Sequence, residues 1–219
     1  IKPPKGIKGE REALTSAEIK LITANWTGHW AGIWAMIMLF AGLRRGEMAA
    51  LRWEDINFTS GILSVKRASD WGIDGDTDTK TEAGIRDVPM PPILLDALQQ
   101  VASEGRAGLI CKSSKGKMLT TSSYVSGWKS FACYLYDCLD DDKIELFDSL
   151  GLVKELCVER QERRKNSRKG DTYEYKRTAL SMTAHQLRHT FATMCFEAGI
   201  DVKTCSKWMG HTDVQTTLK

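Results

Sequence analysis

Residues 183–211, TAHQLRHTFATMCFEAGIDVKTCSKWMGH, are the most informative stretch of this sequence. Apolar side chains recur there at the spacing of an α-helix, and Gly199 and Gly210 interrupt the pattern. The pattern therefore predicts helices over Thr183–Ala198 and Val202–Met209, with a further helix from Val214 onward.

Three polar side chains stand out within this stretch. His185 and Arg188 are three residues apart, so they share one face of the first helix. His211 follows Gly210 at the point where the second helix should end. One His and one Arg on a helix are commonly a solvated or capping pair. The Gly210–His211 pair follows a helix–Gly–helix segment, which favours one site that contains His185, Arg188 and His211.

The segment GLRRGEMAALRW, Gly42–Trp53, supplies a second group of charged residues. It follows His29–Ala41, which is apolar nearly all round and is therefore expected to form a central buried helix. Arg44 and Arg45 lie at the end of that helix, with Glu47 three residues beyond the first arginine. A guanidinium that is oriented by a carboxylate can bind two phosphate oxygens bidentately. Surface Arg–Glu pairs at helix starts are, however, also common.

Between these two segments the pattern changes to that of strands. The sequence predicts strands over Ile62–Arg67 and Ile85–Met90 and suggests another at Leu109–Cys111. Lys80 lies between the first two strands, where a lysine can point into a groove, as exposed hairpin lysines often do. Further helices are expected after a capping box at Thr15–Glu18, over Pro91–Ala102 and over Ser122–Cys138. Residues 139–180 show no clear pattern. The expected fold class is α+β, mostly α-helical, with a small antiparallel β-sheet.

The composition indicates a chain that can fold around a core and whose positive charge is local. The 219 residues are 42% hydrophobic and 27% charged, with a net charge of +3. Residues 159–177 alone contain eight Lys or Arg against four acids. This stretch is either a solvated loop or an arm that contacts phosphates. The residues proposed for that contact are Arg163, Arg164, Lys165, Arg168 and Lys169.

No pattern points to a metal, a cofactor or a membrane. The six cysteines form no CxxC pair and are read as reduced thiols of a cytoplasmic protein. His185 and His189 are four residues apart, but they lack the glutamate of a zinc-binding HExxH motif, and Arg188 would repel a cation. The most apolar run, Ala31–Leu43, is too short to span a bilayer.

In their order and spacing, these motifs resemble the catalytic domain of the tyrosine recombinase (phage integrase) family over about Leu14–Lys219. The resemblance implies the integrase-like catalytic fold and site-specific recombination of double-stranded DNA, in a bacterium or a phage host. It implies that five residues are catalytic and that Glu47 supports them from behind. The five are Arg44, Lys80, His185, Arg188 and His211.

The resemblance also implies a reaction that uses no metal and no cofactor. A tyrosine attacks a DNA phosphodiester to form a 3′-phosphotyrosine, which a DNA hydroxyl later resolves. The two arginines would stabilise charge on the phosphate oxygens, and Lys80 would protonate the leaving 5′-oxygen. His185 would accept the tyrosine proton or orient the phosphate, and His211 would hydrogen-bond a non-bridging oxygen.

The family resemblance sets expectations for both ends of the chain. The nucleophilic tyrosine should follow His211 by nine residues, at position 220, whereas the sequence stops at Lys219. We therefore expect residues 11–219 to be a catalytic domain cut just before its nucleophile, hence inactive and monomeric by itself. Residues 1–10, with two prolines, are expected to be a linker from a missing N-terminal DNA-binding domain. The full-length protein should assemble as a tetramer on DNA.

Two other functions fit parts of the sequence. Phe191–Thr217 has a helix–turn–helix outline, which suits a non-catalytic DNA-binding relative or regulator but leaves Arg44 and Lys80 unexplained. The type IB topoisomerases resemble the same site and reseal DNA without exchanging partners. The short chain and the integrase-like motifs favour the recombinase.

Overall fold

The computed structural model describes residues 13–71, 76–78, 84–102, 107–162, 171–211 and 213. The α-helices are α1 (Ser16–Asn25), α2 (Gly32–Ala41), α3 (Arg45–Ala49), α4 (Pro92–Val101), α5 (Thr121–Asp137), α6 (Asp141–Ser149), α7 (Ala184–Glu197) and α8 (Val202–Met209). Two 3-10 helices are η1 (Trp26–Gly28) and η2 (Trp53–Asp55). The strands are β1 (Ile56–Asn57), β2 (Ile62–Val65), β3 (Arg67–Ser69), β4 (Asp76–Asp78), β5 (Arg86–Pro89), β6 (Val153–Glu162) and β7 (Asp171–Leu180).

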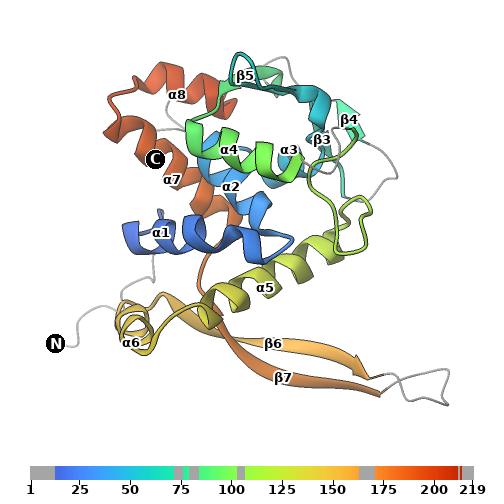
Figure 1. Ribbon diagram of the computed structural model, residues 1–219, viewed down its shortest axis with the longest axis vertical. Helices are drawn as coiled ribbons and strands as arrows, with labels where there is room; N and C mark the ends of the chain where they lie inside the picture. The colour runs from blue at the N-terminus through green and yellow to red at the C-terminus, as the bar shows by residue number, and fades with distance from the viewer. Residues whose placement is uncertain are drawn as a thin grey trace.

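Helix α2 lies at the centre of the molecule, in contact with α1, α3, α4 and α7 (Figure 1). Nearly all of its side chains are buried, as its uniformly apolar sequence requires. The antiparallel sheet β1-β2-β5 lies at one end of this helical body, where β5 contacts α8. The fold is therefore α+β and mostly helical, which confirms the prediction.

The helix boundaries largely follow the capping residues of the sequence. Thr15 and Glu18 form the expected capping box of α1. Helix α2 begins at Gly32, three residues later than the apolar pattern suggested. A Cβ at Gly32 would lie 1.9 Å from the carbonyl oxygen of Trp26, so η1 closes tightly against this position before the helix can start.

Gly42 ends α2 in a conformation that suits glycine. Its φ is 61°, in the left-handed region that L-residues with a Cβ adopt at a cost. A Cβ at this position would also lie 2.4 Å from the ring of Phe191 on α7. The chain therefore turns here in close contact with α7 and delivers Arg44 to the start of α3.

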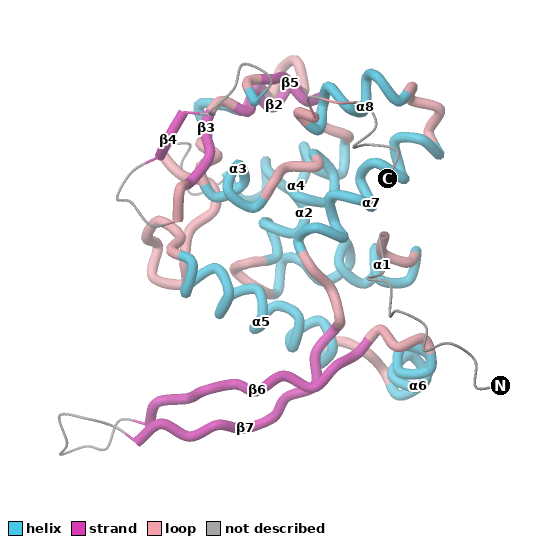
Figure 2. The backbone as a smooth tube through the Cα atoms, turned by 180° about the vertical axis from the view of Figure 1, so that it is seen from behind, coloured by secondary structure: helices cyan, strands magenta, loops and turns pink. Residues whose placement is uncertain are grey.

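Residues 139–180, which show no clear pattern in the sequence, contain α6 and the long β6–β7 hairpin. Strands β6 and β7 pair antiparallel from Val153 opposite Leu180 to Glu162 opposite Asp171. Strand β7 contacts α5, and the hairpin extends away from the helical body (Figure 2). Its far end lies beyond the described part of the chain.

Two strand predictions need correction. Leu109–Cys111 is not a strand, because Leu109 forms only an isolated bridge with Arg52. Two backbone hydrogen bonds, from Trp53 to Gly108 and from Ile110 to Leu51, join this connecting segment to the chain after α3. The predicted strand from Ile62 ends at Val65, and Arg67 begins β3 in a separate two-stranded sheet.

Other predictions cannot be compared with the structure. The linker at residues 1–10 and the helix from Val214 lie outside the described residues. Among the helices of the described ranges, none is both long enough and apolar enough to cross a bilayer.

Candidate functional site

Helix α7 presents His185 and Arg188 to the same region. Thr183 and Gln186 cap its N-terminus reciprocally, so its first turn is fixed. The Arg188 side chain is buried and donates hydrogen bonds to the carbonyl oxygens of Gly42 and Met209. Burial, and then the charge of a neighbouring arginine, lowers the pKa of Arg188 to about 9, so the side chain remains a cation at neutral pH.

Arg44 lies at the N-terminal boundary of α3, directly after the turn at Gly42. Its Nη1 donates to Oε1 of Glu47 at 2.9 Å, and its backbone N–H donates to Oε2 at 2.8 Å. Its Nη2 donates to the carbonyl oxygen of Gly210 at 3.0 Å. The arginine side chain remains 46% exposed, so the guanidinium is oriented by the protein while part of it faces solvent. The Arg44 guanidinium therefore has the Glu47 carboxylate beside it, as the spacing of the two residues predicts.

Gly210 and His211 form the C-terminal turn of α8. Gly210 has a φ of 64°, and the backbone N–H of His211 donates to the carbonyl oxygen of Ser206 at 3.0 Å. Burial, followed by the charges of Arg188 and Arg44, lowers the pKa of His211 to about 4. His211 is therefore a neutral imidazole at pH 7, with one ring N–H to donate and one nitrogen to accept.

His185 is exposed and contacts His189. The two Nε2 atoms lie 2.7 Å apart, and the rings meet edge to face with centroids 4.2 Å apart. Such a contact requires one ring nitrogen to donate its N–H and the other to accept it. Within the described ranges, no group of three or more His, Cys, Asp or Glu residues could hold a metal ion.

Arg86 is part of the same cluster, although the sequence analysis assigned it no role. It donates to both carboxylate oxygens of Glu47, at 3.1 and 2.8 Å, and its Nε donates to the carbonyl oxygen of Trp208. Burial alone would raise the pKa of Glu47, but the hydrogen bond and the charge of Arg86 outweigh it, so that pKa is lowered. A signal was present: alternation along β5 places Arg86 on the buried face with Val88, and a buried arginine requires an acidic partner.

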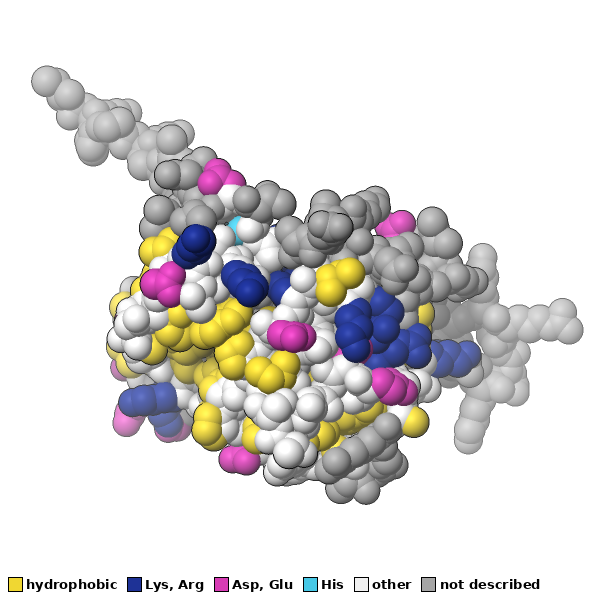
Figure 3. All heavy atoms as spheres, turned by 90° about the horizontal axis from the view of Figure 1, so that it is seen from above, with side chains coloured by type: hydrophobic (Ala, Val, Ile, Leu, Met, Phe, Trp, Pro, Cys, Tyr) yellow, Lys and Arg dark blue, Asp and Glu magenta, His cyan; other side chains and the backbone are white. Residues whose placement is uncertain are grey.

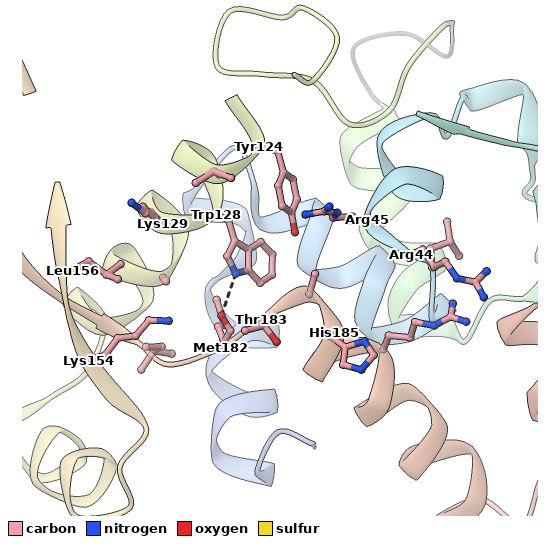
Figure 4. A pocket seen from close by; sticks show the side chains of 16 residues that line it. Arg44, Arg45, Tyr124, Trp128, Lys129, Lys154, Leu156, Met182, Thr183 and His185 are labelled. Atoms are coloured by element: carbon pink, nitrogen blue, oxygen red, sulfur yellow. Dashed lines mark hydrogen bonds between the residues drawn. The ribbon is translucent and has the colours of Figure 1, made fainter. Parts of the chain in front are cut away.

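A cavity of about 550 Å³ lies beside these residues. It extends from Arg44, His185 and Arg188 toward α5 and the start of the hairpin (Figure 4). Its other lining side chains include the cations Arg45, Lys129 and Lys154 and the aromatic residues Tyr124 and Trp128. The indole N–H of Trp128 donates to the carbonyl oxygen of Met182 at 3.1 Å, which fixes one wall.

The structure thus brings together four of the five predicted catalytic residues, with Glu47 behind Arg44. The fifth, Lys80, lies outside the described residues, between β4 and β5. The five basic residues suggested as phosphate contacts also lie outside them; these are Arg163, Arg164, Lys165, Arg168 and Lys169. Seen from the side of α8 and β5, the Lys and Arg side chains of the described residues form separate groups (Figure 3).

Comparison with curated proteins gives relatives that align with nearly the whole chain. A tyrosine recombinase XerC-like protein of Caldanaerobacter subterraneus subsp. tengcongensis is 26% identical over 98% of this chain and 51% of its own length. The tyrosine recombinase XerA of Pyrococcus horikoshii is 25% identical over 99% of this chain and 59% of its own length. The chain therefore spans between half and three fifths of these relatives.

Solved structures show the same fold. The Tn1549 transposon integrase in complex with transposon right end DNA superposes with a TM-score of 0.64 at 20% identity, over 96% of this chain and 62% of that chain. The XerA recombinase gives a TM-score of 0.58 at 18% identity, over 99% and 60% of the two chains. The model of the phage integrase family matches residues 12–219. This chain therefore belongs to the phage integrase family of tyrosine recombinases.

Proposed function

We propose that this chain is the catalytic domain of a site-specific DNA recombinase that cleaves and rejoins strands through a 3′-phosphotyrosine. The observation that carries the proposal is the convergence of Arg44, Arg188 and His211 at the C-terminal end of α8, beside a cavity that His185 also lines. Two guanidinium groups held by carbonyl oxygens and by Glu47 are a fixed receptor for one phosphate.

The proposed reaction exchanges one phosphate ester for another. A tyrosine oxygen attacks phosphorus and loses its proton, while the bond to the 5′-oxygen breaks and that oxygen gains a proton. Arg44 and Arg188 would bind the non-bridging oxygens, whose negative charge is greatest in the transition state. Losing one such contact costs about 3–4 kcal/mol of barrier, or about 10²–10³ in rate.

The proton transfers fall to the remaining polar groups. His185, which contacts His189, would accept or relay the tyrosine proton. His211, neutral at pH 7, would donate its ring N–H to a phosphate oxygen. By the family resemblance, Lys80 would protonate the leaving oxygen. By the same resemblance, the nucleophile would be a tyrosine nine residues after His211.

Double-stranded DNA is the proposed partner. Solved structures of the same fold include the Tn1549 transposon integrase with transposon right end DNA, which supports this choice. Assembly of the full-length protein as a tetramer is part of the same proposal, as is a cytoplasmic location in a bacterium or phage host.

A covalent-trapping experiment tests the proposal. The protein is extended past Lys219 by its next encoded residues and incubated with a nicked suicide substrate that carries its attachment-site DNA. A covalent protein–DNA adduct is expected. Arg188→Lys keeps the positive charge but loses the bidentate contact of the guanidinium. It should slow adduct formation by a factor of about 10²–10³.

Arg67→Lys is the matched control, because Arg67 pairs with the buried Asp55 and not with Glu47. It should react at a rate close to that of the unmodified protein. An extended protein that binds the DNA but never forms an adduct would refute the catalytic proposal and favour a non-catalytic DNA-binding regulator.

A further inference from the structure

Arg86 connects two parts of the site that arrive from different regions of the chain. Its guanidinium donates to both oxygens of Glu47, which in turn accepts from Arg44. The same guanidinium donates to the carbonyl oxygen of Trp208, two residues before Gly210. The group that orients one arginine and the helix end that carries His211 are therefore joined by a single side chain.

We infer that Arg86 is a positioning residue for the proposed cleavage reaction, which fixes Arg44 and His211 relative to each other. The inference rests on the proposed function. The Arg86 side chain is only 2% exposed, so it does not reach DNA itself. Its effect on the reaction must pass through Glu47 and through the end of α8.

The end of α8 shows why the position of this helix matters. Three arginines donate to three successive carbonyl oxygens there: Arg86 to Trp208, Arg188 to Met209 and Arg44 to Gly210. These carbonyls are the negative end of the helix dipole, which favours cations. Two of the three arginines are proposed to bind the phosphate. A displacement of the helix end would therefore move both of them as well as His211.

Arg86 also anchors the chain that follows Lys80. Its Nη1 donates to the carbonyl oxygen of Gly84 at 3.1 Å, and β5, which starts at Arg86, pairs with β2. Arg86 therefore holds the start of β5 and the Glu47 carboxylate together.

The substitution Arg86→Lys separates positioning from charge. A lysine keeps the positive charge beside Glu47, but its compact ammonium group lacks the fixed fork that reaches a carboxylate and the α8 carbonyl together. Arg67→Lys is again the matched control, because Arg67 pairs with a different buried carboxylate, that of Asp55.

The first measurement uses the extended protein on the nicked substrate at saturating DNA, well below the unfolding temperature of every variant. For Arg86→Lys we expect single-turnover cleavage to slow about 10- to 100-fold, since small misplacements of reacting groups cost that much. The DNA dissociation constant should change by less than about twofold, and Arg67→Lys should cleave normally. A purely structural role predicts lower stability for both variants and an unchanged cleavage rate for the folded protein.

The second measurement needs no cleavage and uses the 219-residue chain, so it separates this inference from the proposed function. The ring resonances of His211 are followed by NMR through a pH titration. In Arg86→Lys the nearby charge remains, so a rise of the His211 pKa from about 4 toward 6.5 reports displacement of the α8 end. An unchanged His211 titration overturns the inference, as does normal cleavage by Arg86→Lys. If the unmodified extended protein forms no adduct, the proposed function fails while the titration still decides the role of Arg86.

Discussion

Replacing Gly42 by alanine should destabilise the protein for two separable reasons. The φ of 61° places the residue in the left-handed region, where a Cβ costs about 1–2 kcal/mol. The added methyl would also lie 2.4 Å from the ring of Phe191, which is buried and must move. Overpacking of this kind costs about 1–3 kcal/mol, so the total loss is about 2–5 kcal/mol.

The same substitution at Gly199 isolates the first contribution. Gly199 has a φ of 77°, but a Cβ there would meet nothing within 4 Å. Gly199→Ala should therefore cost only the backbone strain. Replacing glycine by alanine also lowers the conformational entropy of the unfolded chain, and this stabilising effect is the same in both variants. The difference between them, about 1–3 kcal/mol, measures the clash with Phe191.

Thermal unfolding followed by circular dichroism provides the assay. For a domain of this size, 1 kcal/mol lowers the Tm by about 2–4 °C, so Gly42→Ala should melt about 2–12 °C below Gly199→Ala. Adding Phe191→Leu to Gly42→Ala should recover part of that difference, with a coupling free energy of about 1 kcal/mol or more. Equal Tm losses for the two alanine variants would refute the packing argument at this turn.

Two further predictions concern charge. Because the folded-state pKa of His211 is lowered from 6.5 to about 4, the unfolded chain takes up the proton first, so the stability from neutral His211 is complete above pH 6.5 and is lost as the pH falls toward 4. His211→Gln should flatten the stability curve in that window, and urea midpoints that fall as steeply as before would contradict the assignment. In the basic segment, neutralising Arg163, Arg164 and Lys165 should reduce the slope of log K against log salt for DNA binding by up to about 3, if each contacts a phosphate; an unchanged slope would leave the segment a solvated loop.

The sequence predicted the helical core well because its signals are local. The capping box at Thr15 and the uniformly apolar run before Gly42 each determine structure within a few residues of themselves. The β6–β7 hairpin could not be predicted in the same way. Charged residues interrupt the apolar residues of both strands, so the hydrophobic alternation that identifies a strand is weak. The hairpin is defined instead by pairing across ten residues of each strand.

The candidate site shows the same division between local and distant information. Spacing alone placed His185 and Arg188 on one helix face. Spacing could not show that Arg188 donates to Gly42, 146 residues earlier in the chain, or that Arg44 donates to Gly210, 166 residues later. The family resemblance predicted that convergence, whereas the role of Arg86 is visible only in the folded protein, because no motif includes it.

The charge balance of this cluster favours a transition state over a bound substrate. The guanidinium groups of Arg44, Arg86 and Arg188 together with the carboxylate of Glu47 leave an excess of two positive charges, and His211 adds none at neutral pH because its pKa is about 4. A phosphodiester carries one negative charge, and attack by a tyrosine oxygen that has lost its proton brings a second to the phosphorus centre. The proposed site therefore carries more positive charge than intact DNA neutralises, which favours the reaction's most negative state over the bound strand and so favours cleavage.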